Sequence, residues 1–414
     1  MNPLRVVDTC RACGAAPLEP VLALGQTPLA NSLLPPAGGT APTYPLDLAR
    51  CAQCSLVQLG QIVAPDVLFS DYVYFSSNSD TMLRHAEAMV EALSRQENLD
   101  ARSLAVEVAS NDGYLLQYFQ RRGVPVLGIE PAANIARYAQ QEKGIPTVAE
   151  FFGRQTAQQL AADGRCADVL IGNNVLAHVP DLNDFIAGVA TLLKPSGRGV
   201  FEVPYVHDML EQVEFDTIYH EHQCYFSLTA LQHAFGRHAL EVVDVERVPI
   251  HGGSLRVSVA PRGQRRAQAR VGALLAEEAG WGVLAAAPYA AFAQAVADLR
   301  RDLRALLARL KADGAHIAAY GAAAKGVTLT SYCGIGAREL DFVVDRSPHK
   351  QGRRFPVDGL AILAPEALVE RRPEYALLLT WNFADEILRQ QAEYIAAGGT
   401  FIVPVPTPHI CPTN

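Results

Sequence analysis

The sequence lacks three features that would mark a nucleic-acid-binding, membrane or secreted protein. Its 35 Lys and Arg are outnumbered by 43 Asp and Glu, so no basic excess is available to neutralise phosphates. No run of about 18 uncharged apolar residues is present that could cross a bilayer. The first residues, MNPLRVVDTCRACG, have no apolar core followed by a small-residue cleavage site. We therefore expect a cytoplasmic protein with no nucleic-acid or membrane partner and, since no heptad stretch demands a dimer, a monomer.

Eight cysteines are present, and without a secretory signal they are expected to bind metal rather than to form disulfides. Two C-x-x-C pairs stand out, and each can turn two thiolates toward one point. Four thiolates make the closed shell of a structural zinc, which leaves no position for substrate. Four unrelated buried cysteines are the alternative, and the chain between the two pairs is longer than in typical zinc ribbons. The pattern predicts one zinc ion per chain, held by Cys10, Cys13, Cys51 and Cys54.

A chain of 414 residues is too long for one ordinary core, and its composition and hydrophobic pattern divide it into three parts. Residues 1–70 are rich in Pro and Gly, and we expect them to form a zinc-binding domain. Such a segment cannot bury much apolar surface and needs a cross-link such as a bound metal ion to be stable. Residues 71–262 alternate apolar strand-length runs with helical patterns, which is typical of a parallel sheet with helices on both faces. Residues 263–414 begin with a helical stretch and then resume the alternation. The predicted class is α/β, with a central and a C-terminal Rossmann-like sheet.

The central part lacks the dinucleotide pattern G-x-G-x-x-G, so a nicotinamide or flavin cofactor has little support. Instead, VEVASNDGYLL at 106–116 reads as a buried strand, a tight turn and a helix start, and Glu130 ends the next strand. A carboxylate at that point can accept both ribose hydroxyls of an adenosine ligand. Together with GNNVLAHV at 172–179, these features favour S-adenosylmethionine (SAM). A plain α/β domain with capping Asn and Asp is the alternative.

The stretch Tyr219-His220-Glu221-His222 lacks the H-E-x-x-H spacing of a zinc protease. On an extended strand, His220 and His222 point one way and Tyr219 and Glu221 the other, although a turn would change this. With His178 there are enough imidazoles for a catalytic metal, but no third ligand is clearly in place. Proton transfer is favoured, since His titrates near neutrality and a neighbouring Tyr can polarise or relay. Aromatic and His packing beneath a lid is the alternative, and a zinc hydrolase, with two metals per chain, is a further reading.

Other short motifs suggest contacts to a substrate. YVYFSSNS at 72–79 offers hydroxyls and amides where the small domain meets the sheet domain. YGAAAKG at 320–326 places Lys325 at a helix start. This segment is either a phosphate-binding turn or an ordinary strand-helix turn with a surface lysine. Arg353, with its neighbour Arg354, either pairs with a diphosphate or is solvated.

Taken together, these motifs resemble a known family, the SAM-dependent C-methyltransferases that act on nucleotide-linked deoxy-4-keto sugars. The resemblance covers nearly the whole chain and includes CAQCSLVQLG, VEVASNDGYLL, GNNVLAHVPDLNDF, FDTIYHEHQCYFS, HGGSLRV and VVDRSPHKQGR. It implies a zinc-binding domain, a methyltransferase sheet, and a C-terminal Rossmann-like domain without its own cofactor. It also implies roles. Catalysis would fall to His222, Tyr219, Glu221 and His178; cofactor binding to Glu107, Ser110, Asn111, Asp112, Gly113, Glu130, Pro131, Phe151, Phe152, Asn173 and Asn174; substrate binding to Tyr72, Tyr74, Ser76, Ser77, Asn78, His178, Lys325 and Arg353.

The chemistry expected of this family needs a carbon nucleophile, which a C–H bond next to the 4-keto group can supply. Our hypothesis is that His222 removes the proton from C3, or from C5, of a dTDP-linked sugar. Tyr219 and His178 then stabilise the enolate oxygen or orient the base, and Glu221 holds the imidazole tautomer. An O- or N-methyltransferase on a sugar nucleotide is the nearest alternative. A non-catalytic zinc-ribbon scaffold is the alternative from another class.

Overall fold

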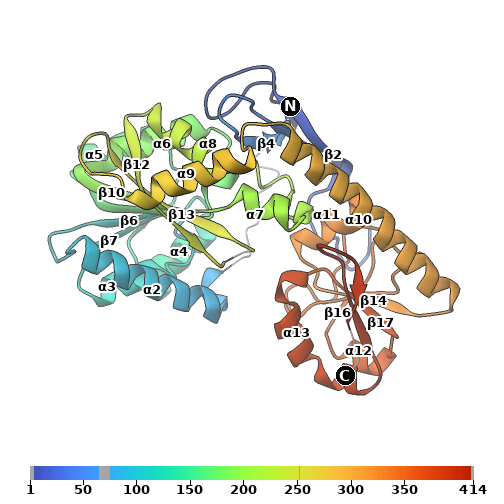
Figure 1. Cartoon of the computed structure of the whole chain (residues 1–414). Helices are drawn as coiled ribbons and strands as arrows, with labels where there is room; N and C mark the ends of the chain where they lie inside the picture. Colours follow the sequence, from blue (N-terminus) through green and yellow to red (C-terminus); the bar gives the residue numbers. More distant parts are fainter. Residues whose placement is uncertain (1–3, 65–74, 251, 412–414) are drawn as a thin grey trace.

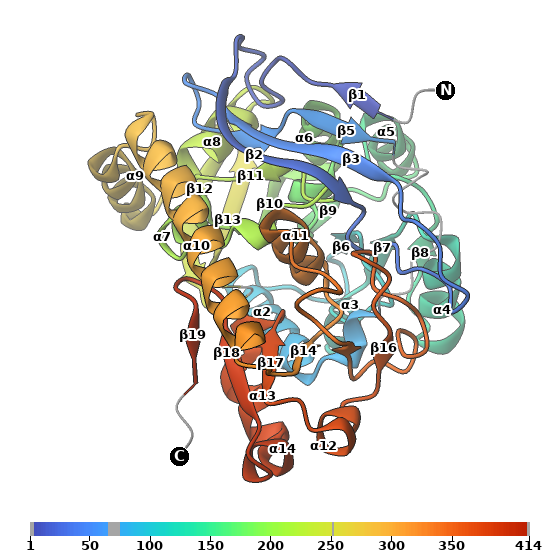
Figure 2. The ribbon, with the colours of Figure 1, turned by 90° about the vertical axis from the view of Figure 1, so that its right-hand side faces the viewer.

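The computed structural model describes residues 4–64, 75–250 and 252–411, except for the side chain of Asn78. Its N-terminal part is antiparallel. Strand β1 pairs with β5, while β2, β3 and β4 form a sheet whose fourth member is β11, a strand from the central part of the chain (β2 and β4 are labelled in Figure 1, the other strands in Figure 2). The N-terminal sheet is therefore completed by residues that follow the His-Glu-His stretch after Gln223. The strands are β1 (Leu4–Val6), β2 (Glu19–Pro28), β3 (Thr43–Arg50), β4 (Val57–Leu59), β5 (Gln61–Val63) and β11 (Cys224–Tyr225).

The central sheet has seven strands in the order β12-β13-β10-β9-β6-β7-β8. The five strands from β10 to β8 are parallel, and β13 runs antiparallel between β10 and β12. Strand order reverses between β6 and β9, so the carboxyl ends of these two strands form the crevice where α/β sheets bind ligands. The strands are β6 (Ala105–Val108), β7 (Val126–Ile129), β8 (Thr147–Val148), β9 (Ala167–Asn173), β10 (Leu193–Pro204), β12 (Leu240–Val248) and β13 (Ser254–Pro261).

Helices cover both faces of the central sheet. One core joins the sheet to α5, α6, α8 and α9, and a second joins its other face to α2, α3 and α4. The helices and 3-10 turns are η1 (Ser76–Asn78), α2 (Asp80–Gln96), α3 (Leu116–Arg121), α4 (Ala133–Glu142), α5 (Arg154–Ala162), η2 (Leu176–His178), α6 (Leu182–Leu192), α7 (Val206–Glu211), η3 (Phe215–Thr217), α8 (Leu228–Gly236) and α9 (Ala269–Trp281).

The C-terminal sheet has six strands in the order β16-β15-β14-β17-β18-β19, all parallel except β19. Its first five strands repeat the order of the central sheet, so both predicted Rossmann-like sheets are present and the α/β class is confirmed. The elements are α10 (Ala287–Ala312), β14 (Ile317–Tyr320), α11 (Ala324–Cys333), β15 (Val343–Val344), β16 (Ile362–Leu363), α12 (Ala367–Arg371), β17 (Tyr375–Leu378), η4 (Trp381–Phe383), α13 (Ala384–Gln390), α14 (Ala392–Ala396), β18 (Thr400–Val403) and β19 (His409–Ile410).

The helical stretch that joins the two sheets divides at Gly282, whose φ of 84° ends α9 in a left-handed cap. Helix α9 packs on the central sheet, whereas α10 packs its apolar face on the N-terminal strands and the C-terminal sheet (Figure 2). Alternate residues of β2 and β3, among them Leu22, Leu24, Leu46 and Leu48, are buried in that core. The expectation that residues 1–70 bury little apolar surface is therefore wrong, since α10 supplies the missing partner. No helix in the described ranges is both long and apolar enough for a bilayer crossing.

Candidate functional site

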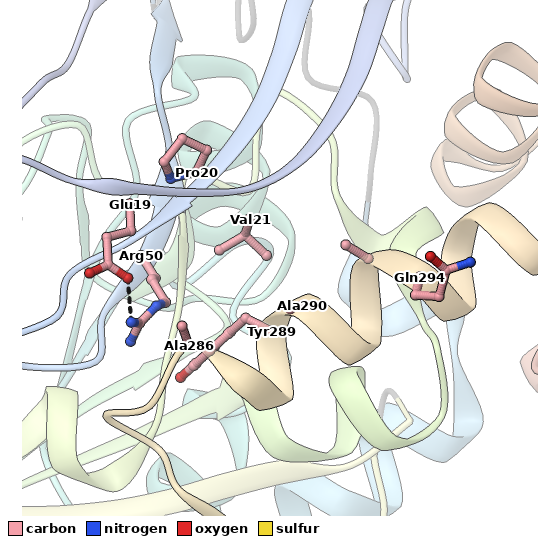
Figure 3. A pocket seen from close by; sticks show the side chains of 9 residues that line it. Glu19, Pro20, Val21, Arg50, Ala286, Tyr289, Ala290 and Gln294 are labelled. Atoms are coloured by element: carbon pink, nitrogen blue, oxygen red, sulfur yellow. Dashed lines mark hydrogen bonds and ion pairs between the residues drawn. The ribbon is translucent and has the colours of Figure 1, made fainter.

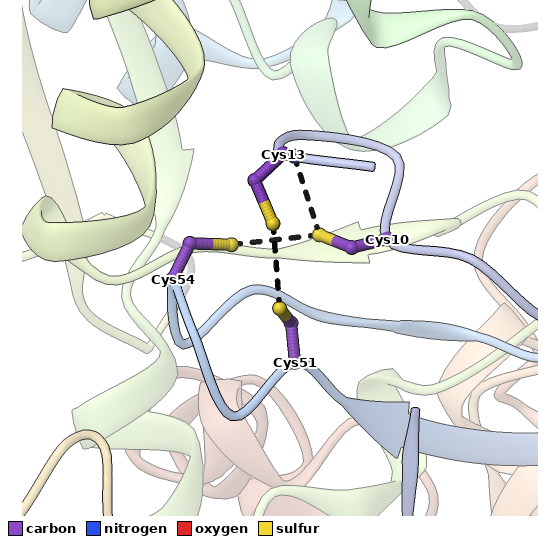
Figure 4. Close-up of side chains that lie close together, drawn as sticks. All are labelled: Cys10, Cys13, Cys51 and Cys54. Carbon is purple, nitrogen blue, oxygen red and sulfur yellow. Dashed lines mark hydrogen bonds between the residues drawn. The ribbon is translucent and has the colours of Figure 1, made fainter. Parts of the chain in front are cut away.

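The four cysteines of the two C-x-x-C pairs converge, and Figure 4 shows their sulfur atoms pointing at one another. All four Sγ atoms lie within 4.8 Å of each other, with Cys10 to Cys54 at 3.4 Å and Cys13 to Cys51 at 3.5 Å. Tetrahedral zinc at about 2.3 Å from each sulfur needs sulfurs about 3.8 Å apart, so the shell fits the ion. The long intervening chain is the β2–β3 hairpin, which returns the second pair to the first.

The turn after β6 is buried and has an unusual backbone shape. Ala109, Asn111 and Gly113 have φ of 55°, 48° and 77°, values that reverse the chain within five residues. At Gly113 a Cβ atom would stand 2.8 Å from Ile145, so only glycine fits. After β7, the Glu130 carboxylate accepts hydrogen bonds from the backbone N–H of Asn111 at 3.0 Å and of Ala132 at 2.9 Å. Each of its oxygens keeps a lone pair for another donor.

Buried polar atoms gather where β6 and β9 end, and several have no hydrogen-bond partner among the described residues. They are Glu107 Oε2, Ser110 Oγ, Asp112 Oδ1, Asn173 Oδ1 and His178 Nδ1. Burial, with Asp112 and Glu130 nearby, raises the pKa of Glu107 well above its ordinary value. Unsatisfied polar atoms are costly in a folded protein unless a ligand supplies the partners. Both the orphaned atoms and the tight bend of this buried turn fit a polar cofactor such as SAM.

The remaining predicted cofactor residues differ in exposure. Phe151, after β8, is 63% exposed, whereas the ring of Phe152 packs edge-on against Phe185 at 5.0 Å. Asn174, with φ of 54°, donates its backbone N–H to the Glu202 carbonyl, and Pro131 directly follows Glu130. Phe151 is therefore the more exposed of the two rings.

The predicted substrate stretch is described only in part. Tyr72 and Tyr74 lie outside the described residues, and so does the side chain of Asn78. Ser76 donates its backbone N–H to the Asn111 side chain at 2.9 Å, and the Ser77 hydroxyl donates to the Asp112 carboxylate. These two serines therefore lie against the turn after β6.

The Tyr-His-Glu-His stretch is a turn, not an extended strand. The backbone N–H of His222 donates to the Tyr219 carbonyl at 2.8 Å, which brings the two side chains together: Tyr219 Oη lies 2.7 Å from His222 Nε2. His220 lies elsewhere, with Nε2 3.3 Å from the Pro45 carbonyl and its ring against Tyr44. The expectation that His220 and His222 share a face is therefore wrong.

The predicted role of Glu221 also needs correction. His222 Nδ1 lies 3.0 Å from the Thr217 carbonyl, so a backbone oxygen holds the ring in place of the Glu221 carboxylate. Glu221 instead accepts two hydrogen bonds from Asn31 Nδ2, at 2.8 and 2.9 Å, from the N-terminal part. The sequence carries no signal for either contact, because one uses a main-chain oxygen and the other joins residues 190 positions apart.

His178 follows β9 and meets this turn. Its ring contacts that of His222 edge-on, with centroids 4.8 Å apart. Burial lowers the pKa of His178 to about 4, while a hydrogen bond to the Glu221 backbone opposes the shift. A neutral ring that donates to this backbone oxygen has its lone pair on Nδ1, the atom without a partner in the described part of the chain.

The predicted phosphate-binding residues occupy two different environments. Lys325, in the first turn of α11, holds its buried Nζ 4.6 Å from the centre of the Trp381 ring. Burial raises the pKa of both Glu214 and Asp216, and the charge of Lys325 opposes this shift; Asp216 also accepts a hydrogen bond from Trp381 Nε1 at 2.6 Å. Arg353 is exposed between β15 and β16. Sequence reasoning did not single out the two acids, although Asp216 lies in the FDTIYHEHQCYFS stretch.

A cavity of about 390 Å³ lies away from these residues, between β2, β3 and α10 (Figure 3). Its lining includes Glu19, Arg50 and Tyr289, and none of the predicted site residues. Arg50 is buried, forms an ion pair with Glu19, and lies 5.1 Å above the Tyr289 ring. These contacts join the N-terminal sheet to α10.

Comparison with known proteins assigns the family. Three family models match: a zinc binding domain at residues 10–69, a methyltransferase domain at 82–245, and a C-methyltransferase C-terminal domain at 249–406. The C-methyltransferase NovU of Streptomyces niveus is 37% identical over 411 residues, 98% of this chain and 97% of its own. The chain belongs to this C-methyltransferase family. It is a SAM-dependent C-methyltransferase whose N-terminal cysteines bind zinc.

Other similarities are partial. A ubiquinone biosynthesis O-methyltransferase of Bartonella tribocorum is 28% identical over 92 residues, 22% of this chain and 37% of its own. Among solved structures, magnesium protoporphyrin IX methyltransferase of Synechocystis PCC 6803, with bound SAM, covers 46% of this chain and 85% of its own, with 15% identity and a TM-score of 0.34. The PH0226 protein of Pyrococcus horikoshii covers 46% and 95%, with 15% identity and a TM-score of 0.37.

Proposed function

We propose that this C-methyltransferase methylates the carbon next to the 4-keto group, preferentially C3, of a dTDP-linked deoxysugar. The observation that carries the proposal is the 2.7 Å contact between Tyr219 Oη and His222 Nε2, in a turn that meets His178 just after β9. Full-length similarity to a C-methyltransferase supports carbon as the acceptor atom. Carbon is a nucleophile here only after a proton has been removed, and a ketone acidifies the neighbouring C–H bond. The site therefore needs a base.

The hydrogen bonds of His222 favour it as that base. A carbonyl only accepts, so Nδ1, which faces the Thr217 carbonyl, carries the ring proton in the neutral state. The lone pair is then on Nε2, where it accepts the Tyr219 hydroxyl. Proton removal leaves an imidazolium whose Nδ1–H still donates to Thr217, so the backbone stabilises the charged form. The ring is thus oriented for proton transfer without a carboxylate partner.

Tyr219 offers two ways to assist. Its hydroxyl can turn from Nε2 to the substrate's keto oxygen and donate to the developing enolate. Alternatively, its oxygen can take the substrate proton while its own proton passes to His222. Both routes leave the substrate carbanion next to the methyl donor.

His178 and Glu221 are proposed to position groups rather than to transfer protons. With its ring proton on the Glu221 backbone, His178 presents an acceptor at Nδ1, suited to a sugar hydroxyl and to fixing the His222 ring. The sequence analysis gave His178 two alternative roles, to stabilise the enolate oxygen or to orient the base. Its hydrogen bonding supports the second role. Glu221 would hold the turn against the N-terminal part through Asn31.

SAM supplies the electrophilic methyl group when bound. We assign its ribose to the free lone pairs of Glu130, its polar tail to the orphaned atoms around the turn, and its adenine to the exposed ring of Phe151. The residues assigned to it are Glu107, Ser110, Asn111, Asp112, Gly113, Glu130, Pro131, Phe151, Phe152, Asn173 and Asn174. Holding donor and acceptor carbons at near-attack distance, with water excluded, is the main contribution of these residues to the rate.

The sugar nucleotide is assigned to the side of the cofactor turn that Ser76 and Ser77 contact. Tyr72, Tyr74 and Asn78 belong to the same stretch of sequence, and Lys325 and Arg353 are the cations proposed for the diphosphate. Of these two, Arg353 is exposed, whereas Lys325 must leave its contact with Trp381 to reach a ligand.

The test replaces His222 by Asn and follows hydrogen exchange. In D2O with a dTDP-linked 4-keto deoxysugar but no SAM, the wild type should introduce deuterium next to the ketone. His222→Asn should slow both exchange and methyl transfer about 10²- to 10⁴-fold. Tyr219→Phe should lose less, because the imidazole remains.

Mass spectrometry and NMR of the product then locate the methyl group. Full exchange in His222→Asn would remove His222 from the role of base. A methyl group on oxygen, nitrogen or C5 would contradict the proposed acceptor, and titration with SAM separates failed binding from failed chemistry.

A further inference from the structure

Arg11 stands between the two cysteines of the first knuckle and is buried, with 8% of its surface exposed. Its backbone is fixed at both ends: the N–H donates to Gln58 at 2.9 Å, and the carbonyl accepts from Asn183. Its guanidinium donates through Nη1 to the side-chain oxygen of Gln223. Nε and Nη2 have no oxygen or nitrogen acceptor among residues 4–64, 75–250 and 252–411, and the guanidinium's other polar neighbour is the buried thiol of Cys224. Within the same ranges, no carboxylate lies within 4.0 Å of this cation.

A buried cation without a counter-charge is strongly unfavourable, and the neutral amide of Gln223 cannot supply one. Four thiolates around a divalent cation carry a net negative charge, so the metal centre can supply one. Arg11 lies between Cys10 and Cys13 in sequence, and its guanidinium is attracted by Cys224 and, less strongly, by Cys10. The guanidinium is therefore balanced when all four cysteines are assembled around zinc.

Gln223 connects this cation to the proposed base. It is fully buried and directly follows His222. Its backbone N–H donates to the Ala177 carbonyl at 2.6 Å, one residue before His178, and its carbonyl accepts from Leu59 at 3.0 Å. A displacement of Gln223 would therefore move both imidazoles of the site.

We propose that Arg11 is a positioning residue for methyl transfer, held by the charge of the zinc–thiolate centre and holding the catalytic turn through Gln223. The zinc site then does more than fold residues 1–70, because its assembly fixes the geometry of His222. This inference rests on the proposed role of His222 as the base.

The test uses Arg11→Gln, Gln223→Leu and the double variant in the full-length, zinc-loaded enzyme. Arg237→Gln is the matched control: this arginine is exposed and donates to the Cys13 carbonyl, but it makes no contact with Gln223 that the structure records. Zinc content, SAM affinity and kcat are measured. The ring-nitrogen NMR signals of His222, assigned with His222→Asn, report its environment independently of turnover.

We expect each single variant to lower kcat about 10- to 100-fold, as outer-shell partners of metal sites do, and to shift the His222 signals. Zinc content and SAM affinity should stay unchanged. The kcat of the double variant should be no lower than that of the less active single variant, because the two substitutions break the same contact. Arg11→Lys should recover part of the loss.

Unshifted His222 signals, wild-type kcat in Gln223→Leu, or losses that add in the double variant would overturn the proposal. If Arg11→Gln loses its zinc, Gln223→Leu decides, since Gln223 is not a zinc ligand. Failure of the base assignment is recognised separately, by full deuterium exchange in His222→Asn.

Discussion

Two carboxylates, Glu130 and Asp345, stand at equivalent points of the two parallel sheets, each directly after the second strand of its sheet. Both accept a backbone N–H from the turn after the first strand: Asn111 at 3.0 Å in the central sheet and Ala322 at 2.8 Å in the C-terminal sheet. Both also accept the N–H two positions further along their own chain. The local structure is thus the same, although the sequences around the two turns, VASNDG and YGAAAK, are not.

The two sites differ in what surrounds the carboxylate. In the C-terminal sheet the Lys350 ammonium donates to the Ala322 carbonyl at 2.9 Å and lies 3.4 Å from Asp345. A side chain of the protein thus occupies the position that a ligand would take. Among the described residues no lysine forms an ion pair with Glu130, and the strand ends carry the orphaned polar atoms described above. Equal topology therefore gives one carboxylate near orphaned polar atoms and one site closed by its own chain.

The largest effect that would test this contrast is the loss of SAM binding in Glu130→Ala. Two hydrogen bonds from ribose hydroxyls to a carboxylate, each worth about 1.5–3 kcal/mol, would disappear. We expect the Kd for SAM to rise at least about 100-fold, measured by calorimetry.

Asp345→Ala is the matched variant. It removes the same two backbone contacts from the other sheet, so it should lower the melting temperature without changing the Kd for SAM. Equal losses of SAM affinity in both variants would show that the two carboxylates act through stability alone.

The fold was largely predictable from the sequence because parallel strands buried on both faces read as continuous apolar runs. AVEV and VLGI, which are fully buried, show this in the central sheet, as IAAY does in the C-terminal sheet. The N-terminal part was not predictable to the same extent. Its apolar strand faces are covered by α10, some 270 residues later in the chain, and no local pattern reports such a partner.

The candidate site was predictable where residue type fixes the chemistry, as at the four cysteines. Glu130 follows β7 as expected, and its contact with the ribose stays a prediction. The site was not predictable where backbone shape decides. Whether Tyr219 faces Glu221 or His222 depends on a turn of four residues, and the orienting partner of His222 is a main-chain oxygen. A sequence pattern reports neither the shape of this turn nor a main-chain hydrogen-bond partner.

Glu214 lies near Lys325, where the central and C-terminal parts of the chain meet, and it should make the stability of the protein depend on pH. Burial raises its pKa to about 7, against the attraction of Lys325 and with repulsion from Asp216 and Asp208. Between its ordinary pKa and 7 the folded state binds more protons than the unfolded state, so this group lowers the free energy of unfolding as pH rises. Glu214→Gln should therefore stabilise the protein at pH 8 by up to about 3 kcal/mol, and the gain should vanish near pH 4.

Chemical denaturation at several pH values measures this difference. Glu211→Gln is the control, because its side chain is 71% exposed on the neighbouring helix α7 and should change stability little at any pH. A gain in Glu214→Gln that is independent of pH would mean that Glu214 does not titrate in this range.

The smallest effect expected is that of opening the closed site with Lys350→Met, which keeps the apolar stem and removes the ammonium. The Lys350 side chain is 35% exposed, so its loss should cost no more than about 1 kcal/mol, close to the cost of Lys311→Met at the comparable pair with Asp341. We expect SAM to bind at one site per chain in both variants, since Asp345 keeps its backbone donors and no orphaned acceptor lies beside it in the described residues. A second equivalent of SAM bound by Lys350→Met would show that the lysine alone closes the C-terminal sheet, and that the orphaned atoms of the central sheet are not needed for recognition.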